Sequence, residues 1–326
     1  MRDSKLKWVL VNIYEKLYDW RRTVIREGKY ALSVRHDRLR IMSPERTIKY
    51  IQKTNCSIAR FGDGEFDLLY QKRDLNFQVT SDALSGALRE VLDSNNPNLL
   101  LCVPGVFNSI RGTNYHAAMF WSHWAIQENR RHSIVELIHS CGKSNYLFGD
   151  AQITRPYIDW ASTKRARKIF PQLKQLWYGK DILIVEGEKT RLGVGNDLFS
   201  DVKSIKRILC PAVNAFTFCE DIFRTVLHFH QNELIVLALG PTATVLAAKL
   251  SECGLQALDL GHVDIEYEWF LSGAKEKQLI PGKYINEIPS GREPEECTDN
   301  GYLREIIASI CNDATDDNRS IEESHE

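Results

Sequence analysis

The sequence has almost no net charge, no cysteine pattern of a metal finger and no long apolar run. Its 42 Lys and Arg balance 43 Asp and Glu, and nucleic-acid partners are not expected, because proteins that bind nucleic acid usually present a strongly basic face. None of the eight cysteines forms a CxxC pair. We therefore expect reduced core thiols in a cytoplasmic protein. With 43% hydrophobic residues over 326 positions, the chain can still bury a substantial core.

Two familiar phosphate-binding motifs are incomplete. Gly142-Lys143-Ser144 matches the end of a P-loop, but Leu137 stands where its first glycine belongs. The pair Gly193 and Gly195 lacks the third glycine of a dinucleotide fingerprint and does not directly follow a predicted strand. Any phosphate site in this chain must therefore be built differently.

Residues 1–42 form a basic segment with many aromatic side chains. Asn12, Glu15, Lys16 and Asp19 interrupt its apolar positions, so we expect neither a signal peptide nor a membrane-spanning helix. The pattern predicts a basic amphipathic helix. Two placements stay open: the helix docks on its own domain, or it contacts an anionic membrane surface or a partner protein, which would place the chain at the inner face of the membrane.

From Ser43 onward, short apolar runs alternate with helical patterns. Strands separated by helices predict an α/β fold with a mostly parallel, Rossmann-like sheet and helices on both faces. We assign this domain to residues 43–285, and residues 286–326 to a C-terminal extension with a disordered acidic tail. The runs typical of buried strands lie at 56–61, 99–103, 146–148, 181–187, 205–210, 234–240 and 257–260.

The first of these runs ends in a turn that carries two carboxylates. Asp63 and Glu65 lie where the strand meets a helix, beside Arg60, and Gly62 and Gly64 free the backbone. Carboxylate oxygens are the ligands that Mg²⁺ and Mn²⁺ prefer, so the turn predicts an anchor for a metal and a diphosphate. Ordinary capping of a helix N-terminus has the same spacing, and spacing alone favours capping over metal binding.

Other polar residues follow the ends of the later strands. In a parallel sheet these ends share one edge, and ligands bind in the crevice there. Arginine side chains fork onto phosphate oxygens, and free amides at a helix N-terminus bind anions. For each arginine taken alone, a surface or salt-bridge role competes. The candidates for binding a nucleoside diphosphate are Arg60, Gly62, Arg155, Arg191, Asn196, Thr242 and Thr244.

Three further candidates follow the last predicted strand: His262, Asp264 and Glu266. If the chain stays extended there, alternate residues share a face, and a general base for deprotonating a hydroxyl is available among them. We name all three as catalytic candidates, and the two carboxylates also as candidates for binding sugar hydroxyls. The alternative is that both carboxylates stabilise the N-terminus of a helix that carries Trp269.

Four ordered motifs resemble the GT-D type family of bacterial glycosyltransferases, first catalogued as a domain of unknown function. The motifs are RFGDGEF at 60–66, TRPY at 154–157, RLGVGNDLF at 191–199 and DLGHVDIEYEW at 259–269, and the similarity spans about residues 45–275. The resemblance implies a Rossmann-like fold of its own type and a UDP-sugar donor. It also implies dependence on Mn²⁺ or Mg²⁺ through an Asp-X-Glu motif, here Asp63 and Glu65.

The resulting hypothesis is a metal-dependent glycosyltransferase. It moves a hexose, with glucose as the first candidate, from a UDP-sugar to a glycan, glycolipid or glycoprotein acceptor in the synthesis of bacterial surface polysaccharide or glycoprotein. The metal and the arginines would stabilise the diphosphate leaving group. The alternative is a nucleotide- or phosphosugar-binding regulatory module without transfer activity.

Overall fold

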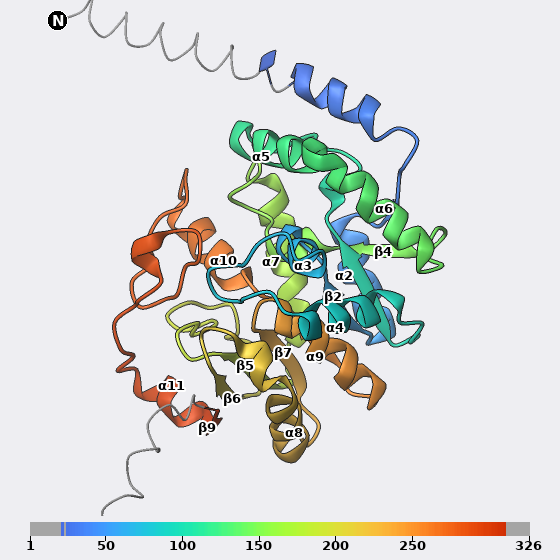
Figure 1. The fold of residues 1–326 in the computed structure, drawn as a ribbon. Helices are drawn as coiled ribbons and strands as arrows, with labels where there is room; N and C mark the ends of the chain where they lie inside the picture. Colours follow the sequence, from blue (N-terminus) through green and yellow to red (C-terminus); the bar gives the residue numbers. More distant parts are fainter. Residues whose placement is uncertain (1–20, 23, 311–326) are drawn as a thin grey trace, which may run out of the picture.

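The computed structural model describes residues 21, 22 and 24–310, and within them nine strands form one sheet (Figure 1). All strand pairings are parallel, in the order β1-β4-β3-β2-β8-β7-β5-β6-β9. The predicted parallel α/β fold is therefore confirmed. The strands are β1 (Arg40–Ile41), β2 (Ser57–Arg60), β3 (Leu99–Val103), β4 (Leu147–Asp150), β5 (Asp181–Gly187), β6 (Ser204–Cys210), β7 (Leu234–Ala238), β8 (Ala257–Asp259) and β9 (Ile306–Ser309).

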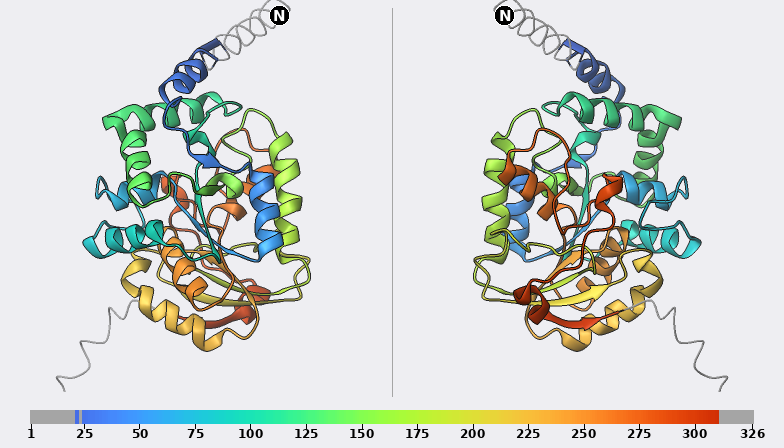
Figure 2. Two further views of the ribbon diagram at one scale, coloured as in Figure 1. Left: turned by 90° about the vertical axis from the view of Figure 1, so that its right-hand side faces the viewer. Right: turned by 90° about the vertical axis from the view of Figure 1, so that its left-hand side faces the viewer.

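Helices cover both faces of the sheet. Connections that run toward the β1 edge place their helices on one face, and connections that run toward the β9 edge use the other, as a single crossover hand requires. Figure 2 shows α2 and α7 together on one face, with α4 and α6 on the opposite face. The first face carries α3 (Asp63–Leu69), α4 (Asp82–Asp93), α5 (Tyr115–Ile126), α6 (Arg130–Ser140), α8 (Cys219–Phe229) and α9 (Pro241–Glu252), and the second carries α2 (Pro44–Thr54), α7 (Lys164–Trp177) and α10 (Val263–Ser272).

The central strands are apolar on both faces, as a covered parallel sheet requires. Successive residues point to opposite faces, so Ile58 of β2 and Leu100 of β3 belong to one core, while Ala59 and Leu101 belong to the other. All four are buried. The seven cysteines in the described part of the chain are free thiols, most of them buried, as expected.

Local sequence signals set the starts of the helices. Ser43 Oγ accepts a hydrogen bond from the Arg46 N–H at 3.3 Å, and Pro44 occupies the first turn of α2. Ser81 Oγ caps α4 in the same way through the Leu84 N–H at 3.1 Å. The segment 115–140 contains two helices, α5 and α6, separated by a short 3₁₀ turn that ends at Asn129 in left-handed backbone conformation.

Both ends of the described chain contribute to the sheet, which widens the domain beyond the predicted 43–285. β1 falls within the predicted N-terminal segment and pairs with β4. β9 falls within the predicted C-terminal extension, follows α11 (Asn300–Glu305) and pairs with β6. β1 is only two residues long, too short to stand out as an apolar run, and β9, with the sequence IIAS, is absent from the predicted strands. The acidic tail predicted to be disordered lies outside the described residues.

Residues 24–33 are helical and pack against α5 and the loop before it (Figure 1). Arg26 Nη1 donates to Ser122 Oγ at 2.8 Å, and Tyr30 is buried with its hydroxyl 3.5 Å from the Phe107 carbonyl oxygen. For this part of the basic segment, docking on its own domain is confirmed. Residues 1–20 lie outside the described part, so a membrane or partner contact of that stretch stays a prediction. No helix between residues 24 and 310 is long and apolar enough to span a bilayer.

Candidate functional site

β2 and β8 are neighbours in the sheet, and the chain leaves them on opposite faces. After β2 it continues through α3 and α4, and after β8 it continues through α10 on the other side. The two departing segments therefore diverge and leave a crevice at the carboxyl ends of the strands, which is where open α/β sheets bind ligands.

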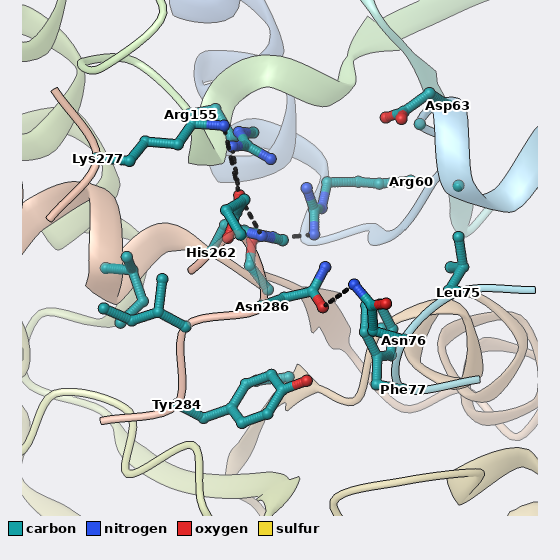
Figure 3. A pocket seen from close by; sticks show the side chains of 18 of the residues that line it. Arg60, Asp63, Leu75, Asn76, Phe77, Arg155, His262, Lys277, Tyr284 and Asn286 are labelled. Atoms are coloured by element: carbon teal, nitrogen blue, oxygen red, sulfur yellow. Dashed lines mark hydrogen bonds and ion pairs between the residues drawn. The ribbon is translucent and has the colours of Figure 1, made fainter. Parts of the chain in front are cut away.

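A cavity of about 990 Å³ occupies this crevice, a volume suited to a substrate-sized ligand. Its walls include residues that follow β2, β4, β5, β7 and β8, together with parts of two loops, 72–79 and 275–287. The two loops meet across the cavity, where Asn76 Nδ2 donates to Asn286 Oδ1 at 3.2 Å (Figure 3). The crevice is thus partly roofed.

Asp63 and Glu65 both line the cavity from the first turn of α3. Glu65 Oε2 accepts a hydrogen bond from the Gly62 N–H at 2.7 Å, so the capping alternative is part of the structure. Asp63 Oδ2 lies 3.4 Å from Arg73 Nη2, and the Asp63 side chain is one third exposed. Burial raises the pKa of both carboxyls, and for Glu65 burial together with the charge of Asp259 raises it to about 7.

The acidic turn has the ligand chemistry of a hard divalent cation. Between residues 24 and 310 there is no cluster of three or more His, Cys, Asp or Glu side chains arranged to hold a metal. Mg²⁺ and Mn²⁺ sites, however, often use one or two carboxylates together with substrate phosphates and water. The cap engages one oxygen of Glu65. Asp63 and Glu65 therefore fit a cation whose remaining ligands come from the substrate.

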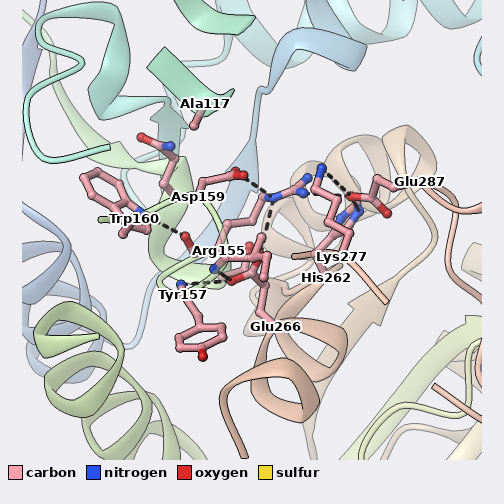
Figure 4. Close-up of polar contacts among 12 residues, drawn as sticks. Ala117, Arg155, Tyr157, Asp159, Trp160, His262, Glu266, Lys277 and Glu287 are labelled. Atoms are coloured by element: carbon pink, nitrogen blue, oxygen red, sulfur yellow. Dashed lines mark hydrogen bonds and ion pairs between the residues drawn. The ribbon is translucent and has the colours of Figure 1, made fainter. Parts of the chain in front are cut away.

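Arg155, His262 and Lys277 surround Glu287 at the cavity wall (Figure 4). Glu287 Oε1 lies 2.7 Å from Arg155 Nη2, 3.2 Å from His262 Nε2 and 3.9 Å from Lys277 Nζ. Burial opposes ionisation of Glu287, but His262 and Arg155 hold its pKa well below the usual range. The guanidinium of Arg155 and the ammonium of Lys277 also suit the oxygens of a phosphate.

The segment after β8 is helical, which corrects the prediction that His262, Asp264 and Glu266 share one face. α10 begins at Val263, with His262 as its N-cap in left-handed backbone conformation. Residues two apart on a helix point in different directions. The two carboxylates instead lie in the first turn of α10, as the alternative reading proposed.

Asp264 and Glu266 are both buried and engaged by other protein groups. Asp264 lines the cavity, but its Oδ2 pairs with Lys283 Nζ at 2.6 Å. Glu266 is not among the residues that line the cavity; its Oε2 accepts the N–H groups of Tyr157 and Ile158 at 2.9 and 3.1 Å (Figure 4). The geometry therefore favours Glu266 as the residue that positions the loop of Arg155.

Arg60 lines the cavity but donates all five of its guanidinium N–H groups to the protein. Nε and Nη2 bond the carbonyl oxygen and carboxylate of Asp259, Nη2 also reaches Gly261 O, and Nη1 bonds Ala151 O and Thr154 Oγ1. Arg60 thus holds β2, β8 and the loop after β4 together. In this arrangement it has no free N–H group for the phosphate contact predicted from sequence.

Four other candidates lie outside the residues that line the cavity. Arg191 Nη1 donates to two backbone carbonyls, and Asn196 Nδ2 donates to carboxylates of α10. Thr244 Oγ1 donates to the carbonyl oxygen of Arg60 at 2.9 Å, and Thr242 is fully buried. The geometry favours structural roles for these four. Of the predicted binding residues, Arg60, Gly62 and Arg155 line the cavity, and Arg155 Nε lacks a hydrogen-bond partner.

The two loops that roof the cavity are absent from the prediction. Neither follows a strand, so the rule that placed candidates at strand ends gives no signal for them. Phe77 of the first loop packs on Gly240 at the end of β7, where φ is +53° and an added Cβ would lie 2.4 Å from the ring. In the sequence, the glycine at position 240 is the only signal for this close packing of the Phe77 ring, because glycine tolerates a positive φ and leaves room for a neighbouring side chain.

The sequence is similar to known glycosyltransferases. Residues 58–288 match the family described as Glycosyltransferase GT-D fold. The chain is 38% identical over 271 residues to Probable glycosyl transferase Gly of Streptococcus gordonii, covering 83% of this chain and 39% of that protein. It is 35% identical over 278 residues to Glycosyltransferase GlyD of Streptococcus pneumoniae serotype 4, covering 85% and 33% respectively. The chain thus spans between a third and two fifths of the length of these curated relatives.

Solved structures share the fold. One, described as "The highly conserved domain of unknown function 1792 has a distinct glycosyltransferase fold", aligns with a TM-score of 0.78 at 36% identity and covers 87% of this chain and 100% of its own. A second, described as a new glycosyltransferase from Streptococcus sanguinis, aligns with a TM-score of 0.76 at 36% identity and covers 84% and 100%. By its sequence match over residues 58–288 and its fold, the chain belongs to the GT-D fold family of glycosyltransferases.

Proposed function

We propose that this chain is a metal-dependent glycosyltransferase that moves a hexose, glucose first among the candidates, from a UDP-sugar to a glycan acceptor. The observation that carries the proposal is the position of Asp63 and Glu65 at the same cavity as Arg155 and Lys277. Carboxylates for a cation and cationic groups for phosphate, in one crevice at the strand ends, suit a diphosphate with its metal.

The nucleotide is assigned to the end of the cavity at β5, β6 and β7. Small residues line this end, and Phe77 and Tyr284 supply aromatic rings (Figure 3). Aromatic rings beside small residues suit a pyrimidine base. The Asn76–Asn286 pair lies beside it, and amide groups offer both donors and acceptors to the edge of a base.

During transfer, negative charge develops on the diphosphate as its bond to the sugar breaks. Mn²⁺ or Mg²⁺, if held by Asp63 and Glu65, would supply positive charge to the leaving diphosphate. Arg155 and Lys277 contribute fixed positive charge at the same wall, and Glu287 keeps Arg155 oriented through the 2.7 Å contact. The chain's own share of catalysis is thus a preorganised electrostatic environment for the leaving group.

Of the three predicted catalytic residues, His262 keeps the most accessible place at the cavity. Its Nε2 lies 3.2 Å from Glu287 Oε1, and its side chain is about one third exposed. In such an imidazole–carboxylate pair the imidazole accepts a proton from a hydroxyl, and the carboxylate stabilises the imidazolium that forms. We assign the general base to this pair, and positioning roles to Asp264 and Glu266.

The setting belongs to the same proposal. The curated relatives are streptococcal proteins named as glycosyltransferases, which supports a bacterial glycan, glycolipid or glycoprotein as the acceptor. The reaction is placed in the cytoplasm, at the inner face of the membrane, in the synthesis of surface polysaccharide or glycoprotein.

A panel of UDP-sugars tests the proposal. The purified chain is incubated with each donor and Mn²⁺, and UDP release is measured with and without EDTA. We expect release with one donor, highest for a UDP-hexose, and loss of release with EDTA. Asp63→Asn and Glu65→Gln should abolish it while the fold is kept, because the glutamine still offers an acceptor to the Gly62 N–H. Asp82→Asn, in the first turn of α4, is the matched control.

Two outcomes would contradict the proposal. Binding of UDP without turnover of any donor, with acceptors supplied, supports the regulatory module instead. Full activity in both carboxylate variants returns Asp63 and Glu65 to a purely capping role.

A further inference from the structure

One face of α5 forms the wall of the cavity on the β3 and β4 side. His116, Ala117, Phe120 and Trp121 line the cavity, and their spacing of one, four and five residues puts them on one side of a helix. Phe120 is 45% exposed, whereas Trp121 is 8% exposed. A large apolar ring is therefore presented to the cavity.

The ring of Phe120 is held in place from behind. It meets Trp121 edge to face, with centroids 5.3 Å apart, and Trp121 in turn contacts Phe107 and Trp124 in the core. Because the supporting rings are buried, the exposed ring is a rigid surface that needs little ordering when a ligand binds.

The loop after β4 forms the adjoining wall. Ile158 and Asp159 line the cavity there. Asn114, the N-cap of α5, ties the two walls together, since its Nδ2 donates to Ile158 O at 2.8 Å and its backbone N–H donates to Asp159 O at 2.9 Å. Figure 4 shows Asp159 beside Ala117 of α5. Asp159 Oδ2 lies 3.7 Å from Arg155 Nε. The two walls together thus present the ring of Phe120, the carboxylate of Asp159 and the imidazole of His116.

This end of the cavity lies away from the proposed nucleotide end. In the sheet, β3 and β4 lie to one side of β2 and β8, while β7, β5 and β6 lie to the other. Asp63 and His262 follow β2 and β8, between these two groups of strands, and Arg155 follows β4. A transferase must hold its second substrate next to the bond that is exchanged, and the α5 end is the part of the cavity not assigned to the nucleotide.

We propose that His116, Phe120, Trp121 and Asp159 form the subsite for a neutral pyranose ring of the acceptor. The apolar C–H face of a pyranose packs on Phe120, and Asp159 and His116 hydrogen-bond its hydroxyls. The cavity by itself shows only that its two ends differ chemically. That one end binds a sugar of the acceptor rests on the proposed transfer to a glycan.

Binding of simple glycosides tests the subsite without knowledge of the full acceptor. The probes are methyl β-D-glucopyranoside, methyl β-D-galactopyranoside and methyl N-acetyl-β-D-glucosaminide, followed by saturation-transfer-difference NMR on the full chain with UDP and Mn²⁺ present. We expect contact of the pyranose ring protons with the protein for at least one probe. Phe120→Ala should weaken that binding by roughly tenfold, in line with the loss of one ring contact, and Phe120→Tyr should retain it.

Two controls separate the subsite from the rest of the molecule. Tyr178→Ala removes a ring that is 62% exposed and does not line the cavity, and it should leave glycoside binding unchanged. UDP binding, measured on the same samples, should be equal in wild type and Phe120→Ala. Once turnover is detected, Phe120→Ala should raise the KM for the acceptor and leave the KM for the donor unchanged.

The inference is overturned if none of the three glycosides binds, or if Phe120→Ala binds them as wild type does. If UDP–Mn²⁺ binding and donor turnover are intact in that case, only the acceptor subsite is wrong and the proposed function stands. If glycosides bind at Phe120 while no UDP-sugar is turned over, the subsite stands and the proposed donor chemistry fails.

Discussion

Arg60 and Asp259 join the two strands at which the chain diverges to opposite faces of the sheet. Arg60 Nη2 lies 2.7 Å from Asp259 Oδ1, Nε donates to Asp259 O at 2.6 Å, and the Arg60 backbone N–H reaches Asp259 Oδ2 at 3.2 Å. The Asp259 side chain is 3% exposed. The ion pair therefore holds the crevice in shape from below.

Arg60→Gln should destabilise the chain by about 3–5 kcal/mol, because it leaves the buried Asp259 without its charge partner. The free energy of unfolding from urea denaturation measures this. Arg89→Gln, which breaks the exposed pair with Asp93, is the control and should cost less than about 1 kcal/mol. Equal effects of the two substitutions would contradict the structural role of Arg60.

Gly240→Ala should destabilise the chain through its contact with Phe77. The substitution combines a positive φ with a Cβ 2.4 Å from the ring, and the overpacking should cost about 1–3 kcal/mol beyond the backbone strain. Gly195→Ala is the matched control, since Gly195 also has positive φ but open space around it. Comparison of the unfolding free energies isolates the steric part. If the double variant Gly240→Ala, Phe77→Ala is no more stable than Gly240→Ala alone, contact with the Phe77 ring does not cause the loss of stability.

Arg73→Gln should strengthen binding of Mn²⁺ in the absence of donor. Arg73 Nη2 lies 3.4 Å from Asp63 Oδ2 and competes there with a cation. Because the Arg73 side chain is half exposed, screening limits the effect to roughly threefold to tenfold in Kd. Calorimetric titration with Mn²⁺ alone measures it, and added salt should reduce the difference. Unchanged or weaker Mn²⁺ binding in Arg73→Gln, with Arg89→Gln as the control, would count against Asp63 as a ligand.

Glu266 should make the stability of the chain fall as the pH rises from about 5 to 8. Burial raises the pKa of Glu266 to about 7 against the opposing charge of Arg155, while an unfolded glutamate titrates near 4.5. The folded state therefore binds this proton more tightly, and its advantage is lost as pH rises through the folded pKa. The loss is on the order of 3 kcal/mol.

Glu266→Gln should flatten this dependence, because the amide keeps an acceptor for the Tyr157 and Ile158 N–H groups but does not titrate. Urea denaturation of both forms at pH 5 and pH 8 measures the slope. Glu65 titrates in the same range and retains its own share in the variant. A wild-type slope unchanged by Glu266→Gln would show that Glu266 has an ordinary pKa.

Much of the fold was readable from the sequence because its signals are local. The apolar runs at 181–187 and 234–240 became β5 and β7, and Ser43 and Ser81, of a residue type that favours the N-cap, cap α2 and α4. The edge strands β1 and β9 were missed, since their few residues become strands only by pairing with a neighbour already in place.

The candidate site divides in the same way. The sequence by itself determined that Asp63 and Glu65 follow a buried strand at the start of a helix, because a polar Gly-Asp-Gly turn and the apolar residues before it are local features. Tertiary structure decided which side chains remain available at the cavity. Arg60 is hydrogen-bonded to Asp259, and Glu266 accepts the backbone N–H groups of Tyr157 and Ile158. Phe120 and Glu287, which the sequence did not single out, line the cavity walls. The physical reason is that a side chain's hydrogen-bond partners and exposure depend on segments far away in the chain, and no local pattern encodes them.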